Sequence, residues 1–89
     1  MRVSTITKQR IAGRDSAFAR LLGREIRRRR VALQLSQTEA GHPLSRAFLS
    51  SVENGRMVPS LPSLVMIARR LNSTAASILA SVESQLEDP

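Results

Sequence analysis

The stretch LSQTEAGHPLSRAFLSSVENGRMVPSL, residues Leu35 to Leu61, decides the fold of this 89-residue chain. Ser36 and the glutamate three residues later, Glu39, have the spacing of a capping box, which satisfies free amides at the start of a helix. Gly41 and Pro43 follow closely, and both residue types disfavour the continuation of a helix. We therefore expect a very short helix that begins after Ser36 and ends before Pro43.

A second helix follows in the same stretch. Ser45 is a good N-cap residue, and Asn54-Gly55 ends the helix because glycine readily adopts the left-handed conformation of a helix end. Phe48, Leu49 and Val52 share one side of this helix, which we expect to face inward. The opposite side of its first turns carries small polar and basic residues: Ser45, Arg46, Ala47, Ser50 and Ser51.

Apolar residues recur at three- and four-residue spacing on both sides of this stretch, which is the period of an amphipathic helix. Upstream, a long helix is predicted from a cap at Asp15 or Ser16. Its inward stripe is Phe18, Leu22, Ile26, Arg29/Arg30 and Leu33. Downstream, Ser60 and Thr74 cap two further helices. Their stripes are Leu61, Leu64, Ile67, Ala68 and Leu71, then Ile78, Leu79, Val82 and Leu86. Because no alternating strand pattern occurs, the chain is predicted to be all-α with five helices.

The charges divide the chain unevenly. Residues 1–30 hold ten Lys and Arg against two acids, a net of +8, whereas residues 31–89 hold four against five, a net of −1. Residues 1–14 are basic without an acid, a cap or helical periodicity, so we predict a flexible arm there, a compact domain over 15–80 and a C-terminal helix extension over 81–89. The basic pole favours a polyanionic partner, although an arginine-rich surface also simply keeps a small protein soluble.

The composition excludes several classes of function. The chain has no cysteine, and its one histidine, His42, cannot form a metal site alone. It shows no nucleophile–base pair, no phosphate-cradling glycine loop and no carboxylate dyad, so we expect neither an enzyme nor a cofactor. No apolar run reaches the roughly eighteen residues of a membrane span, and the start lacks a signal sequence. We therefore expect a cytoplasmic protein without a membrane partner.

A series of ordered blocks runs through the chain. They are Ile26-Arg27 with Arg30, Leu35-Ser36-Gln37, Leu44-Ser45-Arg46, Leu49-Ser50, Val52-Glu53-Asn54-Gly55-Arg56, Pro59-Ser60-Leu61, and Ile67-Ala68 with Leu71. In this order and at these separations, residues 22 to about 79 resemble the lambda-repressor-like helix-turn-helix domain, also called the Cro or xenobiotic-response-element type. The resemblance covers about two-thirds of the chain.

The resemblance implies a sequence-specific transcriptional regulator of double-stranded DNA, with the helix over 45–54 in the major groove. It places Arg46 where it can make a bidentate contact with guanine. The DNA-binding residues it implies are Ser36, Gln37, Ser45, Arg46, Ala47, Ser50, Ser51 and Arg56. It also implies a structural ion pair between Arg30 and Glu53. Periodicity supports this pair, because Arg30 lies one turn from Ile26 and a buried charge needs a partner.

Binding by this fold normally uses a dimer, so a homodimer on a palindromic operator is expected. Val82 and Leu86 extend beyond the family boundary, and we predict that they form the dimer face; an exposed apolar pair on a solvated tail is the rival interpretation. Two interpretations of the basic arm stay open. Either it follows the DNA backbone or enters the minor groove, as the arms of some DNA-binding proteins do, or it is a disordered tail without a role.

The chain departs from the family pattern between Gln37 and Ser45. This segment is about two residues shorter than is usual, Ala40-Gly41 stand where Leu-Ala is common, and Pro43 replaces a turn glycine. The departure keeps a second hypothesis open: a protein-interaction module of the same fold, antitoxin-like or regulator-binding, with weak DNA contact. Gln34 and Asn72 also stand at positions often held by glycine and require a local backbone adjustment.

Overall fold

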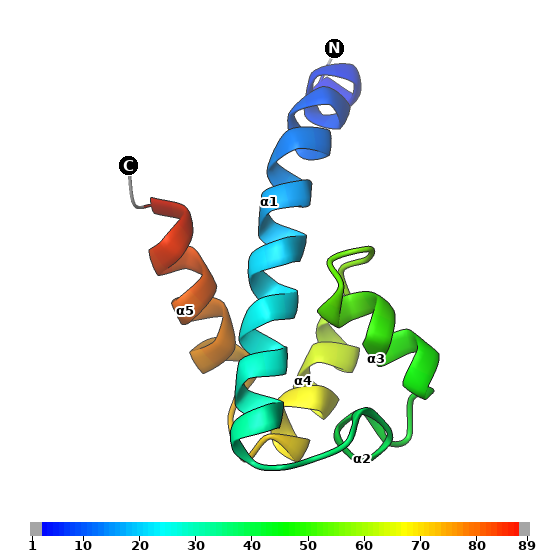
Figure 1. Cartoon of the computed structure of the whole chain (residues 1–89). Coiled ribbons are helices and arrows are strands. Elements are labelled where there is room, and N and C mark those ends of the chain that lie inside the picture. The colour runs from blue at the N-terminus through cyan, green and yellow to red at the C-terminus, as the bar shows by residue number, and fades with distance from the viewer. Residues whose placement is uncertain (1–2, 88–89) are drawn as a thin grey trace.

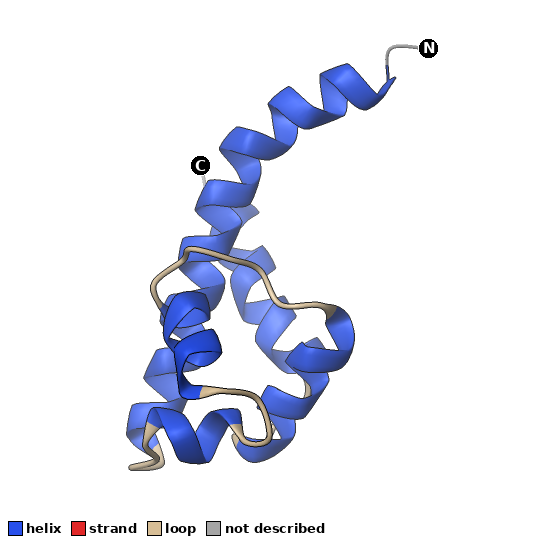
Figure 2. Ribbon diagram, turned by 90° about the vertical axis from the view of Figure 1, so that its right-hand side faces the viewer, coloured by secondary structure: helices blue, strands red, loops and turns tan. Residues whose placement is uncertain are grey.

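A computed structural model describes the backbone of residues 3–87 and the side chains of residues 17–86. Within that range it holds five helices and no strand, which confirms the all-α prediction. The helices are α1 (Val3–Ala32), α2 (Gln37–Gly41), α3 (Arg46–Glu53), α4 (Leu61–Arg70) and α5 (Ala75–Glu87). In Figure 1, α5 lies on one side of α1 and the α2–α3 pair lies on the other. Figure 2 shows these helices gathered around the C-terminal half of α1, whose N-terminal end extends beyond them.

The four caps predicted for α2 to α5 are all present. The side chains of Ser36, Ser45, Ser60 and Thr74 each accept a hydrogen bond from the backbone amide three residues further on. Ser36 and Glu39 form both bonds of the predicted capping box. Because each cap satisfies an amide that has no partner within the helix, each contributes about 1 kcal/mol to stability.

The predicted start of the first helix is wrong. The helix begins at Val3 rather than after a cap at Asp15 or Ser16, so residues 3–14 continue α1. No proline interrupts this segment, and a single glycine weakens a helix without ending it. Arg2 and the side chains of the other arm residues lie outside the described residues, so the mobility of the arm and its contact with DNA stay predictions.

The core lies between the C-terminal half of α1 and helices α2 to α5. Its largest fully buried side chains are Leu22, Ile26, Leu49, Val52, Ile67, Ile78 and Val82. Three residues of the predicted stripes are instead exposed: Leu33, Leu61 and Leu86. Leu33 follows the last residue of α1, while Leu61, which is 65% exposed, begins α4 and Leu86 lies in the last turn of α5. The periodicity is correct within each helix and fails at its ends.

Gln34 and Asn72 adopt the backbone adjustment that the sequence predicts. Their φ angles are 59° and 56°, in the left-handed region that glycine adopts most easily. Gln34 follows the end of α1, and Asn72 follows the end of α4. At these two positions the chain accepts a strain of about 1 kcal/mol each in order to turn sharply between helices.

A polar network fastens α1 to α5. The carboxylate of Glu25, which is buried on α1, accepts hydrogen bonds from Arg28 and Arg29. Arg29 also donates to α5 and the turn before it: its guanidinium lies 2.7 Å from the hydroxyl of Ser73 and 3.3 Å from that of Ser81. The buried carboxylate is thus fully satisfied, and it holds Arg29 in place against α5.

We expect this network to make the stability of the fold sensitive to acid. The hydrogen bond from Arg28, helped by that from Arg29, lowers the pKa of Glu25 below its ordinary value of 4.5 against the opposing effect of burial. A carboxyl group whose pKa is lowered by folding stabilises the fold fully above its unfolded pKa. That contribution is lost as the pH falls from about 4.5 through the lower folded value.

The variant Glu25→Gln should therefore show a shallower fall in the free energy of unfolding below pH 4.5 than the original chain does. Urea unfolding at a series of pH values between neutrality and about pH 3 measures this. Glu83→Gln, which changes an exposed glutamate of α5, serves as the control and should leave the slope unchanged. Equal acid slopes for Glu25→Gln and the original chain would show that Glu25 is not the group responsible.

Candidate nucleic-acid interface

The predicted ion pair between Arg30 and Glu53 is present and joins three helices. Arg30 Nε lies 2.6 Å from Glu53 Oε2, and a terminal nitrogen lies 3.0 Å from Oε1. Its other terminal nitrogen donates to the carbonyl oxygen of Leu35 at 2.8 Å. Gln37 of α2 donates to the same Glu53 carboxylate at 3.0 Å. The hydrogen bond with Glu53 raises the pKa of Arg30, so the guanidinium stays charged and α1, α2 and α3 are held at one point.

Gly23 sets the distance between α1 and α3. A Cβ atom built there would overlap the carbonyl oxygen of Val52 and would lie 2.6 Å from that of Glu53. The absence of a side chain thus lets the two backbones meet near the end of α3. Sequence reasoning gave Gly23 no role, and its one signal was a glycine inside an otherwise regular helical pattern.

Helix α3 has an inward side and an outward side. Leu49, Val52 and Glu53 are buried against the rest of the domain, while Arg46 and Ala47 in the first turn are exposed. The remaining predicted contact residues of α3, Ser50 and Ser51, are half-buried on the outward side. Ser45 is exposed, and its hydroxyl already accepts the amide hydrogen of Phe48 as a cap. The structure therefore brings these five predicted residues together along one helix.

The shortened turn between α2 and α3 is closed by small residues. Ala40 is fully buried, and a Cβ atom on Gly41 would lie 3.3 Å from that of Leu49 on α3. A leucine and an alanine at these positions would need more room, so Ala40-Gly41 let α2 pack closely with fewer connecting residues. Arg70 of α4 donates to the carbonyl oxygen of His42 in the turn. His42 is exposed, as expected for a surface turn.

Three of the predicted DNA contacts lie outside α3, two at the start of α2 and one in the loop after α3. Gln37 is half-buried at the start of α2, where one of its amide hydrogens is used by Glu53. Arg56 is exposed in the loop after α3, and Gly55, with a φ of 72°, turns the chain toward it. Ser36 is exposed beside Gln37, with its hydroxyl engaged in the capping box.

The electrostatics of α2 and α3 favour an anion. The two acidic side chains of these helices are both engaged: Glu39, whose pKa is lowered by the backbone amide of Ser36, and Glu53, which pairs with Arg30. Among the described residues, Arg46 and Arg56 form no ion pair, and both are exposed. Arg46 on the outward side of α3 and Arg56 in the loop after it therefore carry positive charges that no described acidic side chain pairs with.

Val82 does not lie on the surface, so the prediction that it forms a dimer face is wrong. It is 0% exposed, because α5 turns this residue into the protein's own core. Leu86, one turn further along α5, is 43% exposed.

The family model described as Helix-turn-helix matches residues 26–78, which is more than half of the chain. The chain belongs to the lambda-repressor-like helix-turn-helix family. This is a family of DNA-binding transcription regulators, and its helix-turn-helix is formed here by α2 and α3. No curated protein and no solved structure matches the chain. Within residues 3–87, no helix of this helix-turn-helix protein combines the length and apolar character that crossing a membrane requires.

Proposed function

We propose that this helix-turn-helix protein is a sequence-specific transcriptional regulator that binds double-stranded DNA as a dimer on a palindromic operator, with α3 in the major groove. The observation that carries the proposal is the division of α3. Its inward side is fixed by Leu49, Val52 and the Glu53–Arg30 pair, while Arg46 and Ala47 extend into solvent from its first turn. A rigid helix with a free, positive N-terminal face is what major-groove recognition requires.

Each exposed side chain suits one kind of contact. The Arg46 guanidinium has the donor geometry for O6 and N7 of guanine, and the methyl group of Ala47 suits the thymine methyl group. Ser50 and Ser51 can bond to bases or to phosphates. Gln37 and Arg56 lie at the two ends of the helix-turn-helix, where polar and positive groups contact the DNA backbone.

The variant Arg46→Ala should stay folded and lose selectivity. Losing a bidentate contact with guanine costs about 1–3 kcal/mol of discrimination, which is roughly a 5- to 150-fold loss of preference for the operator over random duplex. The operator is first selected from a random DNA pool with the unaltered protein. Fluorescence anisotropy then compares both duplexes for Arg46→Ala and for Arg69→Ala, which removes an exposed arginine of α4.

Arg69→Ala should keep the preference, and both variants should keep the circular dichroism of the original chain. An Arg46→Ala protein that still prefers the operator to the original extent would remove α3 from the proposed reading face.

A protein-interaction module is the second candidate, and the five-residue α2 and its shortened turn favour it. Such a module would bind DNA weakly and without preference. Titrations at two salt concentrations separate the two functions, because released counterions make phosphate contacts strongly salt-dependent while base contacts keep a selective fraction. Selective binding that survives the higher salt supports the regulator; loss of all selectivity supports the module.

A further inference from the structure

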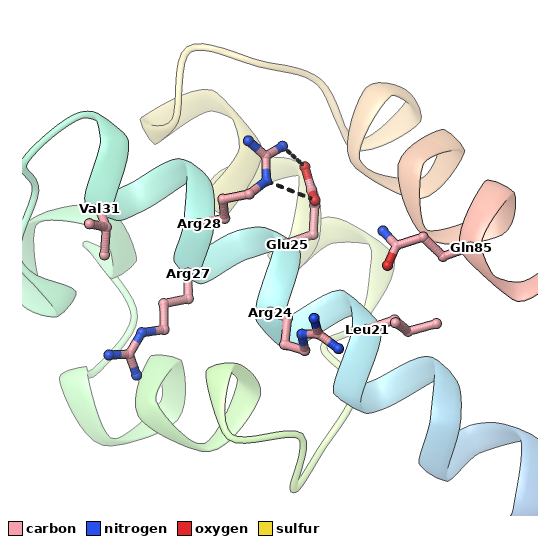
Figure 3. Close-up of a pocket in the computed structure, with 7 residues that line it drawn as sticks. All are labelled: Leu21, Arg24, Glu25, Arg27, Arg28, Val31 and Gln85. Atoms are coloured by element: carbon pink, nitrogen blue, oxygen red, sulfur yellow. Dashed lines mark hydrogen bonds and ion pairs between the residues drawn. The ribbon is translucent and has the colours of Figure 1, made fainter.

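The outward face of α1 is strongly basic and is hollowed by a groove of about 550 Å³, which Arg24, Arg27 and Arg28 help to line (Figure 3). Among the described side chains of α1, these three and Arg20 are exposed arginines. Arg28 is paired with Glu25. Arg20, Arg24 and Arg27 form no ion pair with a described residue. Helix α1 thus displays positive charge that the described part of the protein does not balance.

Arg20 and Arg27 lie on the side of α1 that meets α3. Gly23, which touches the backbone carbonyl groups at the end of α3, comes three residues after Arg20 and four residues before Arg27. Helical spacing therefore places these three residues on one side of α1. Arg20 also packs against the loop after α3, because a Cβ atom on Gly55 would lie 3.1 Å from Arg20 Cγ. Figure 3 shows Arg27 extending from α1 toward α3 and Arg28 extending in the other direction.

The loop after α3 adds a third arginine to this region. Arg56 follows Gly55, is exposed and forms no ion pair with a described residue. Glu53, the acidic residue in the last turn of α3, is already paired with Arg30. Exposed arginines without acidic partners are thus gathered around the last turn of α3, and such a concentration of like charge favours a polyanionic partner.

The length of α3 relates these arginines to DNA. In the proposed docking, the first turns of α3 contact base edges. The helix has 8 residues and is about 12 Å long, whereas the major groove is only about 8.5 Å deep. The last turn of α3 therefore lies near the sugar-phosphate backbone at the edge of the groove, and Gly23 brings α1 into contact with that turn.

We propose that Arg20 and Arg27 of α1 bind phosphate groups of the DNA strand at the edge of the groove that α3 enters. This inference rests on the proposed function, because it assumes that docking. It extends the DNA-binding surface from the helix-turn-helix of α2 and α3 to the preceding helix. Since phosphates carry no sequence information, the two arginines raise the affinity for every sequence and leave the choice of sequence to α3.

The salt dependence of binding tests the inference. Each phosphate contact adds about 0.9 to the steepness of the plot of log affinity against log salt concentration. Arg20→Gln and Arg27→Gln should therefore each lower the steepness by about 0.9, and each should weaken binding to the operator and to random duplex by the same factor. Fluorescence anisotropy titrations of the full chain between about 50 and 200 mM salt measure both quantities.

Lysine variants separate the charge from the shape of the side chain. Arg20→Lys and Arg27→Lys keep the positive charge, so they should keep the steepness of the original chain. Arg69→Gln, which neutralises an exposed arginine of α4, is the control and should leave the steepness unchanged. Glutamine and lysine are both good helix formers, and circular dichroism checks that every variant is folded.

An unchanged steepness in the double variant of Arg20→Gln with Arg27→Gln overturns the inference and favours an acidic protein as the occupant of the groove. A loss of affinity for the operator alone also overturns it, because the contacts would then be with bases. The proposed function fails by a different result, which is equal affinity of the original chain for operator and random duplex. The steepness measured on random duplex would still show whether the two arginines contact phosphates.

Discussion

Replacing Glu53 with glutamine is expected to lower the free energy of unfolding by about 3–5 kcal/mol. The amide has nearly the shape of the carboxylate but no charge. It therefore leaves the guanidinium of Arg30, whose side chain is 13% exposed, without a counterion beside a residue whose own side chain is 2% exposed. Gln37 loses its charged acceptor in the same step. Since small domains are stable by only about 5–15 kcal/mol, this loss removes a large fraction of the stability of the fold.

Urea unfolding followed by circular dichroism at about pH 7 measures this effect. Glu83→Gln, which makes the same chemical change on an exposed position, should shift the curve little when the protein is dilute enough to be monomeric. Removing both charges, as in Arg30→Met with Glu53→Leu, should cost less than Glu53→Gln, because no buried charge is then left unpaired. An unchanged midpoint for Glu53→Gln would show that the pair does not hold the helices together.

Replacing Gly23 with alanine should lower the free energy of unfolding by about 3 kcal/mol, nearly as much as Glu53→Gln does. This value is the upper end of the usual cost of overpacking a core, about 3 kcal/mol. Alanine normally stabilises a helix interior relative to glycine. Here its methyl group would overlap the Val52 carbonyl oxygen and press on that of Glu53, and backbone atoms cannot rotate out of the way. Helices α1 and α3 must separate, which also stretches the bonds between Arg30 and Glu53.

Gly41→Ala is the matched control for Gly23→Ala. Gly41 is also a buried helical glycine, but a methyl group there would lie 3.3 Å from Leu49 Cβ, so its neighbour has to yield by only a few tenths of an ångström, much less than the carbonyl groups that face Gly23. We expect the stability of Gly41→Ala to stay within about 1 kcal/mol of the original. Thermal unfolding of both variants under the same conditions makes the comparison. Equal losses would mean that helix propensity, and not the contact between α1 and α3, decides the effect.

Features that depend on neighbours in the chain could be predicted from the sequence. The starts of α2 to α5 depend on a serine or threonine and the next three residues, so the caps were predicted at the correct positions. The pairing of Arg30 with Glu53 also followed, because the family pattern and the helical period both place Arg30 on the inward side. The start of α1 could not be found in this way, since the residues that precede it in the sequence, Met1 and Arg2, are not N-cap residue types.

Features that depend on how helices pack could not be predicted. The need for glycine at Gly23 comes from the carbonyl groups of Val52 and Glu53, far along the chain, and it arises only when α1 meets α3. Val82 and Leu86 share one apolar period, yet the core takes the first and leaves the second on the surface. Apolar periodicity shows which residues lie on one side of a helix. It does not show which of them the core of the same chain buries. The proposed DNA contacts rest on the exposed side of α3 and on family membership.

The two-sided character of α3 has a consequence for evolution and engineering. Leu49, Val52 and Glu53 anchor the helix, whereas Arg46, Ala47, Ser50 and Ser51 take no part in the fully buried core. Mutation can therefore vary these four outward positions while the scaffold remains intact. A library randomised at these positions should yield folded proteins with altered operator preferences, and related genes in one genome can diverge in their targets by the same route.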